Sequence, residues 1–180
     1  MIHKYENKWA AWNLIEVLSF GDFIKLYELY YSLYPEQANE VTSDLIWPLK
    51  FIRNASAHNN CLLNTLRKPY VYTHLYDNKR KTTIVNKRLV SLLSLLPTIT
   101  KKNRKKKITN PVIHDFVASL FLLDEICTSQ VFKKKIFTEL KDFMEGRLIK
   151  NKEYFSSDNV FTSIYEFIKN VVDYLYERNV

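Results

Sequence analysis

The residues of this sequence that are best suited to chemistry lie within a few positions of one another. Arg53, Asn54 and His58 fall in a segment whose apolar spacing is that of a helix. Asn54 and His58 are four residues apart and share one helix face, and the long Arg53 side chain reaches round to the same opening. Arginine clamps phosphate oxygens, and an imidazole with a pKa of about 6.5 exchanges a proton near neutral pH. The three side chains together therefore suit a phosphodiester.

The Arg-x4-His spacing is a weak signal by itself. Seven arginines and four histidines in 180 residues make a chance pair of this kind unsurprising. A helix that simply ends with an exposed arginine and a capping histidine gives the same pattern. Glu16 is a further candidate for the same cleft, and its alternative is an exposed helix position.

Other kinds of site have little support in the sequence. The two glycines, Gly21 and Gly146, are too few for a glycine-rich phosphate loop. His3, His74 and His114 lack the spacing of a metal site, and there is no zinc-ligand set of cysteines. The two cysteines form no CxxC pair, which favours a reduced, cytoplasmic compartment. We therefore expect no metal, no cofactor, no signal peptide and no membrane span.

The net charge of +8 is distributed unevenly along the chain. Residues 67–107 contain thirteen basic residues and one acid, whereas the remainder contains 14 basic and 18 acidic residues. This basic segment favours a polyanion partner, with nucleic acid first and an anionic membrane second. Its alternative is a solvated connection between helices. The candidate nucleic-acid-binding residues are Lys79, Arg80, Lys81, Lys101, Lys102, Arg104, Lys105, Lys106 and Lys107.

Hydrophobic periodicity predicts one all-α domain over residues 1–180. Trp9, Trp12 and Ile15 recur at three-residue intervals and are predicted to lie on a buried helix face. Asp124 lies in an apolar helix and is predicted to mark its exposed side. The predicted helices cover residues 5–18, 23–33, 42–58, 84–96, 110–127 and 129–149, with a last helix capped within 156–158, a loop at 66–83 and a solvated basic connection at 101–107.

Two phrases in the first third of the chain carry a resemblance to a known family. Residues 19–27 read SFGDFIKLY, and residues 52–64 read IRNASAHNNCLLN. They resemble the abortive-infection (Abi) family of bacterial phage-defence proteins, a branch of the HEPN ribonuclease superfamily, over about residues 12–65. Two positions depart from the family pattern. Asn59 replaces the second histidine of the usual pair, and Cys61 stands where the family often has arginine.

The resemblance implies a HEPN-like helical bundle that cleaves RNA without a metal. The ribose 2′-OH would attack the adjacent phosphorus and leave a 2′,3′-cyclic phosphate and a 5′-OH. His58 would act as general base or acid, Arg53 would stabilise the developing charge, and Asn54 would position His58 or the substrate. Because each chain carries one motif, the superfamily usually builds its cleft from two copies, so a symmetric homodimer is expected.

Two other functions remain open at this point. A catalytically inactive RNA-binding or antitoxin-binding module would keep the fold without the activity, and the departures at Asn59 and Cys61 favour it. A helical scaffold whose basic segment binds a protein is the third interpretation. For the leading hypothesis, a phage-defence or toxin endoribonuclease, the expected partners are RNA, a second copy and an RNA or protein antitoxin, with no membrane.

Overall fold

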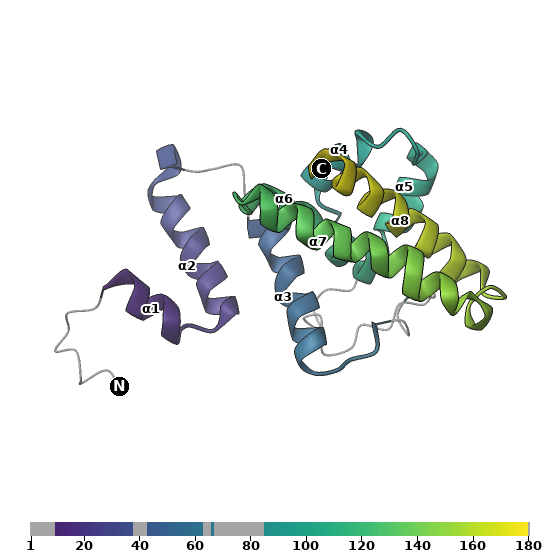
Figure 1. Ribbon diagram of the computed structural model, residues 1–180. Helices are drawn as coiled ribbons and strands as arrows, with labels where there is room; N and C mark the ends of the chain where they lie inside the picture. Colours follow the sequence, from purple (N-terminus) through teal and green to yellow (C-terminus); the bar gives the residue numbers. More distant parts are fainter. Residues whose placement is uncertain (1–9, 38–42, 63–65, 67–84, 180) are drawn as a thin grey trace.

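Eight α-helices and no strands make up the described part of the chain, which comprises residues 10–37, 43–62, 66 and 85–179 of the computed structural model (Figure 1). The predicted all-α class is therefore confirmed. The helices are α1 (Ala11–Val17), α2 (Phe20–Leu33), α3 (Ser43–Ala57), α4 (Lys87–Ser94), α5 (Lys101–Ile108), α6 (Pro111–Ile126), α7 (Gln130–Asp142) and α8 (Asn159–Asn179). A π-helical turn, Phe143–Leu148, follows α7 directly.

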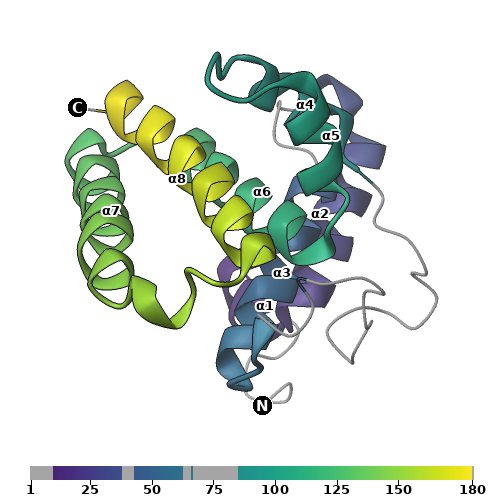
Figure 2. The same ribbon diagram turned by 90° about the vertical axis from the view of Figure 1, so that its right-hand side faces the viewer.

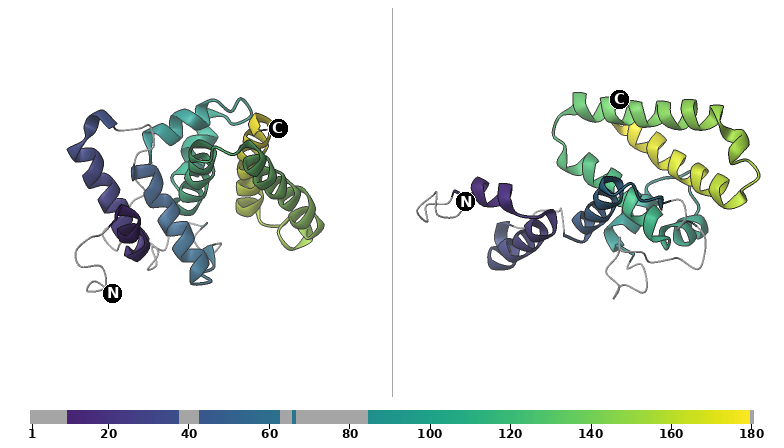
Figure 3. Two further views of the ribbon diagram at one scale, coloured as in Figure 1. Left: turned by 60° about the vertical axis from the view of Figure 1, so that its left-hand side comes forward. Right: turned by 90° about the horizontal axis from the view of Figure 1, so that it is seen from below.

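Helix α6 is the centre of the core. It is buried along most of its length and packs against α3, α4, α5 and α8. Phe121 of α6, Phe137 of α7 and Phe167 of α8 are the largest fully buried side chains. Removing rings of this size from water is the main source of stability in such a core. Figure 2 shows α6 behind α8, and Figure 3 shows α7 and α8 side by side on the face away from the N-terminus.

The helix starts follow from local capping chemistry. Asn110 begins α6, and its Oδ1 accepts hydrogen bonds from the backbone N–H groups of Val112 at 2.9 Å and Ile113 at 3.2 Å. Pro111 occupies the first helical position, where its missing N–H costs nothing. Ser19 caps α2 in the same way, with its Oγ accepting from the N–H of Asp22 at 3.2 Å. The predicted start of the helix at Asn110-Pro111 is confirmed.

Three predictions about the elements are wrong. The solvated connection at 101–107 is the helix α5, capped by the Thr100 hydroxyl. Asp124 is buried in the core instead of marking an exposed side, because α7 and the end of α8 cover it. Trp12 and Ile15 are 69% and 49% exposed, because α1 packs little against the other described helices. Trp9 and the predicted loop at 66–83, apart from Leu66, lie outside the described residues.

Candidate functional site

Helix α3 carries Arg53 and Asn54, and His58 directly follows its last residue, Ala57. Its buried side, which includes Leu45, Ile46 and Ala55, packs against α6, and its neighbour on the other side is α2. This packing leaves Arg53 and His58 exposed and places Asn54 at the boundary, half-buried. The apolar pattern of α3 therefore turns the set outward, where a ligand can reach it.

The structure joins Arg53 to Asn54 rather than Asn54 to His58. Arg53 donates a hydrogen bond from Nη1 to Asn54 Oδ1 at 3.0 Å. The backbone N–H of His58 donates to the backbone oxygen of Asn54 at 3.0 Å, so His58 continues the helical turn. Within the described part of the chain the His58 ring has no hydrogen-bond partner. Asn54 is therefore placed to orient the guanidinium, and the imidazole is oriented only by the backbone.

Asn59 ends the helix directly after His58. Its φ of 50° is left-handed, a conformation that asparagine tolerates better than most residues. The N–H of Asn60 donates to the Ala55 oxygen at 2.9 Å, and the N–H of Asn59 donates to the Ser56 oxygen at 3.2 Å. This is a Schellman cap. The departure at Asn59 therefore falls at the helix end, and Cys61 beyond it is an exposed free thiol.

Lys50 lies on the same face of α3, one turn before Asn54. Its Nζ is 4.7 Å from the centroid of the Trp47 ring, in a cation–π contact. Its ammonium also lies against Gly21 of α2, and a Cβ added to Gly21 would be 2.6 Å from Lys50 Nζ. The sequence analysis missed Lys50. The signal that could have found it is the spacing of positions 50, 54 and 58, which are four residues apart.

Asp22 stands at the start of α2, on the helix that faces Lys50. A hydrogen bond from the Ser19 hydroxyl at 2.7 Å, then one from Lys25 at 3.1 Å, lower the pKa of its carboxyl group. The more distant charge of Lys50 acts in the same direction. The SFGD phrase therefore has a local role, because Ser19 caps the helix and Gly21 leaves room for Lys50.

The basic residues of α5 divide into two groups. Lys101, Lys102, Lys105 and Lys106 are exposed. Arg104 instead turns inward and donates from Nη1 to the Leu93 oxygen at 3.2 Å and the Ile99 oxygen at 2.9 Å.

Lys107 is the second inward-facing cation of α5. It is buried, and that burial, followed by the charge of Lys106, lowers its pKa. Arg104 and Lys107 are therefore engaged within the fold, and Lys79, Arg80 and Lys81 lie outside the described residues.

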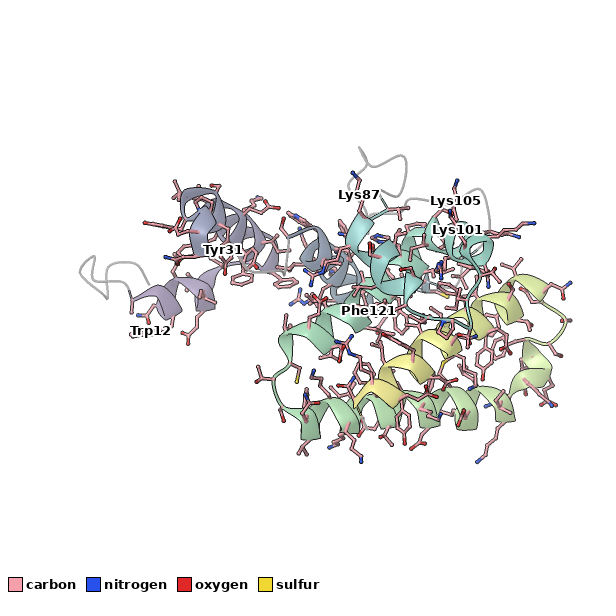
Figure 4. The ribbon with its side chains drawn as sticks, turned by 90° about the horizontal axis from the view of Figure 1, so that it is seen from above. Trp12, Tyr31, Lys87, Lys101, Lys105 and Phe121 are labelled. Carbon is pink, nitrogen blue, oxygen red and sulfur yellow. The ribbon has the colours of Figure 1, made fainter. Side chains whose placement is uncertain are left out.

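Lys87 at the start of α4 adds an exposed charge to the lysines of α5. Figure 4 shows Lys87 and Lys105 projecting away from the helical body on the same side. In Figures 1 and 2, α5 lies towards the opposite end of the molecule from the C-terminal end of α3. The structure therefore does not bring the exposed lysines of α5 together with Arg53 and His58.

Comparison with known proteins identifies the first third of the chain. The family model described as Abi-like protein matches residues 1–64. Over these residues the chain is similar to Abi-like proteins. The Abi-like segment contains both phrases, and with them Gly21, Arg53 and His58. Searches of curated proteins and of solved structures found no significant match. This similarity points to a role in phage defence.

Four further observations concern the residues outside the Arg-Asn-His set. His114 is a core residue, whose Nε2 accepts from the N–H of Asn86 at 3.2 Å and whose Nδ1 lies 2.9 Å from Asp115 Oδ1. Nowhere in the described ranges do three His, Cys, Asp or Glu side chains gather as a metal site would require. The described helices are also too short or too polar to cross a membrane. Glu16 is exposed on α1.

Proposed function

We propose that this chain is a metal-independent endoribonuclease of phage defence or of a toxin system. The observation that carries the proposal is the Arg53–Asn54 hydrogen bond beside an exposed histidine at the end of α3, within the Abi-like segment. A guanidinium held by a hydrogen bond next to an exposed imidazole is a suitable pair for phosphodiester chemistry.

The reaction follows from the two side chains. The ribose 2′-oxygen attacks phosphorus, and the bond from phosphorus to the 5′-oxygen breaks. His58 takes the proton of the 2′-OH or gives one to the leaving 5′-oxygen. Arg53, held by Asn54, stabilises the negative charge that develops on the phosphate oxygens. The products are a 2′,3′-cyclic phosphate and a 5′-OH.

A homodimer with two facing sets is part of the proposal. A single chain offers one general acid or base, whereas cleavage uses both a base and an acid. Large apolar side chains stay exposed on α1 and α2, on the α3 side of the molecule (Figure 1), and they support a second copy at this end. The exposed residues are Trp12, Ile15, Val17, Leu29 and Leu33. Light scattering at micromolar concentration should give twice the monomer mass, and a strict monomer would contradict the composite cleft.

The exposed lysines of α5 are proposed to bind the RNA backbone without sequence preference. Phosphate contacts of this kind supply affinity that falls as salt rises. An RNA or protein antitoxin that covers this surface or the α3 site would hold the activity in check.

An inactive RNA-binding or antitoxin-binding module is the second candidate function. It is favoured by the His58 ring, which no described side chain orients, and by the loss of the second histidine at Asn59. Total RNA incubated with the protein in EDTA separates the two functions. We expect the wild type to cleave, and His58→Ala and Arg53→Ala each to lose about 10²–10⁴-fold in rate.

The matched control for this experiment is Ser56→Ala, an exposed change on the same helix. It should cleave at the wild-type rate. Equal inertness of the wild type and His58→Ala, with RNA binding retained, would favour the inactive module. Cleavage by Arg53→Ala at the wild-type rate would contradict the role of the guanidinium.

A further inference from the structure

We propose that Lys50 forms a second phosphate-binding position, which holds the RNA backbone one turn of α3 before the Arg-Asn-His set. The inference rests on the proposed function and names the substrate contact that extends its site. The ligand class is the phosphodiester backbone of single-stranded RNA.

The position of Lys50 along α3 is the first support. Residues 50, 54 and 58 are four apart, so they follow one helix face in steps of about 6 Å. A backbone that passes His58 and Arg53 along this face therefore meets the Lys50 ammonium next. Sequence-independent contacts of this kind set the register of a nucleic acid without reading its bases.

The electrostatic surroundings of Lys50 are the second support. Three other half-buried or buried lysines lie close to carboxylates: Lys133 Nζ is 3.5 Å from Asp124, Lys141 is 3.2 Å from Asp173, and Lys169 is 2.7 Å from Asp173. Lys107 of α5 is the exception, since it is buried and has no carboxylate partner among the described residues. Lys50 is half-buried too, yet across the described ranges no carboxylate lies within ion-pair distance of it. Its contact is the face of Trp47, which attracts a cation but leaves its N–H donors unused.

This arrangement favours an anionic ligand. A cation that is partly removed from water loses hydration, and a carboxylate usually offsets that loss. At Lys50 the direct contact is the Trp47 ring, and the Asp22 carboxylate acts on it only from beyond ion-pair distance. A phosphate can therefore accept hydrogen bonds from the Lys50 ammonium directly. Lys141 and Lys169 would first have to break an ion pair with a carboxylate.

Gly21 is the third support, because it makes room for this ammonium. Neither glycine in the chain has a positive φ, so the backbone of α2 does not require glycine at position 21. Glycine inside a helix costs stability relative to alanine. A Cβ there would lie 2.6 Å from Lys50 Nζ, which is closer than real Cβ atoms approach, so the flexible end of the Lys50 side chain would have to shift. The glycine therefore leaves room for the ammonium in its present position.

The test measures binding of a labelled 2′-O-methyl oligouridine, which cannot be cleaved because it lacks the attacking hydroxyl. Fluorescence anisotropy over a range of salt concentrations gives the slope of log K against log salt. Lys50→Met should weaken binding about threefold to tenfold and reduce the steepness of that slope by about 0.7, the value for one lost phosphate contact on a single strand. Lys135→Met, an exposed lysine on α7, is the control and should leave the slope unchanged.

Gly21→Ala perturbs the same ammonium without removing its charge. It should weaken binding in the same direction as Lys50→Met, while its melting temperature stays at or above that of the wild type because alanine favours the helix. The double variant should bind no more weakly than Lys50→Met, because both changes act on one group. An unchanged slope in Lys50→Met, or an equal change in Lys135→Met, would overturn the inference.

The two proposals can fail separately. If the wild type never cleaves RNA but Lys50→Met reduces the salt slope, the endoribonuclease proposal fails and Lys50 remains a phosphate contact of a binding module. If cleavage depends on His58 but the slope is unchanged in Lys50→Met, the activity stands and the second phosphate-binding position is wrong.

Discussion

Two polar clusters in this molecule contain similar groups in opposite surroundings. Asp124 is 4% exposed. Its carboxylate lies close to Lys133 of α7 and to Arg178 and Asn179 at the end of α8. Arg53, Asn54 and His58 lie at the surface of α3 with one side-chain hydrogen bond among them. The first cluster ties three helices together. The second cluster leaves side-chain N–H donors at the surface, where a ligand can reach them.

The regions around the two clusters differ in the same way. Helices α6, α7 and α8 bury Phe121, Phe137 and Phe167. Helices α1 and α2 leave Trp12, Leu29 and Leu33 exposed, and α7 also exposes Val131 and Phe132 at its start. Replacing a buried polar group lowers the free energy of unfolding strongly, whereas replacing an exposed one changes it little. The difference indicates that α1 and α2 contribute less buried apolar surface to the described fold than the C-terminal helices do.

Loss of the buried carboxylate should have the largest effect on stability. Asp124→Ala leaves the Lys133 ammonium, whose closest contact is the Asp124 backbone oxygen at 2.7 Å, without its counter-charge. We expect a loss of about 3–5 kcal/mol in the free energy of unfolding, measured by urea denaturation. Glu139→Ala removes an exposed carboxylate from Lys135 and should cost less than about 0.5 kcal/mol. Equal losses in the two variants would contradict the comparison.

Loss of the helix caps at Asn110 and Ser19 should have the next largest effect on the free energy of unfolding. Asn110→Ala removes a buried oxygen that accepts two backbone N–H groups, and we expect a loss of about 1–2 kcal/mol. Ser19→Ala removes the exposed cap of α2 and should cost about 0.5–1 kcal/mol. Urea denaturation of both variants measures the difference. A larger loss in Ser19→Ala would show that the Abi-like segment contributes more to stability than its exposure indicates.

The contribution of the Asp173 carboxylate to stability can be tested by changing the pH. Burial acts to raise the pKa of its carboxyl, but hydrogen bonds from Lys169 and Lys141 outweigh it, so the pKa is lowered from the usual 3.8. The ionised form is therefore the stabilising one, and its contribution is present above pH 3.8 and lost as the pH falls below it. Asp173→Asn should destabilise by up to about 1 kcal/mol at pH 7. Thermal melts should show that this difference shrinks below pH 3.8; a constant difference would contradict the lowered pKa.

The smallest effect on stability is expected at the candidate site. Arg53 and His58 are exposed and bury no apolar surface that the core needs. Arg53→Ala and His58→Ala should therefore change the free energy of unfolding by less than about 0.5 kcal/mol, although both are expected to abolish cleavage. A loss above 1 kcal/mol in either variant would assign that residue to the fold rather than to a ligand.

Local chemistry made much of the fold predictable from the sequence. The 3.6-residue periodicity and the caps at Asn110 and Ser19 act over a few residues, so they place helices without knowledge of the rest of the chain. The spacing of Arg53, Asn54 and His58 likewise placed them on one helix. The two phrases at residues 19–27 and 52–64 indicated the family that the comparison then found.

Tertiary packing decided what those local patterns leave open, because burial of a side chain depends on which other helix covers it. In the sequence Arg104 is one more cation in a basic run, yet it turns inward to the carbonyl of Leu93 in α4 and that of Ile99 just before α5. The sequence predicts an exposed Asp124, but α7 and α8 cover this residue in the fold. Lys50 and Gly21 are 29 positions apart, and only the contact of α2 with α3 brings them together. The sequence by itself determined most of the helices, α5 excepted, and the spacing of the Arg-Asn-His set along the chain. The packing of those helices decided which charges hold the fold and which remain exposed to a ligand.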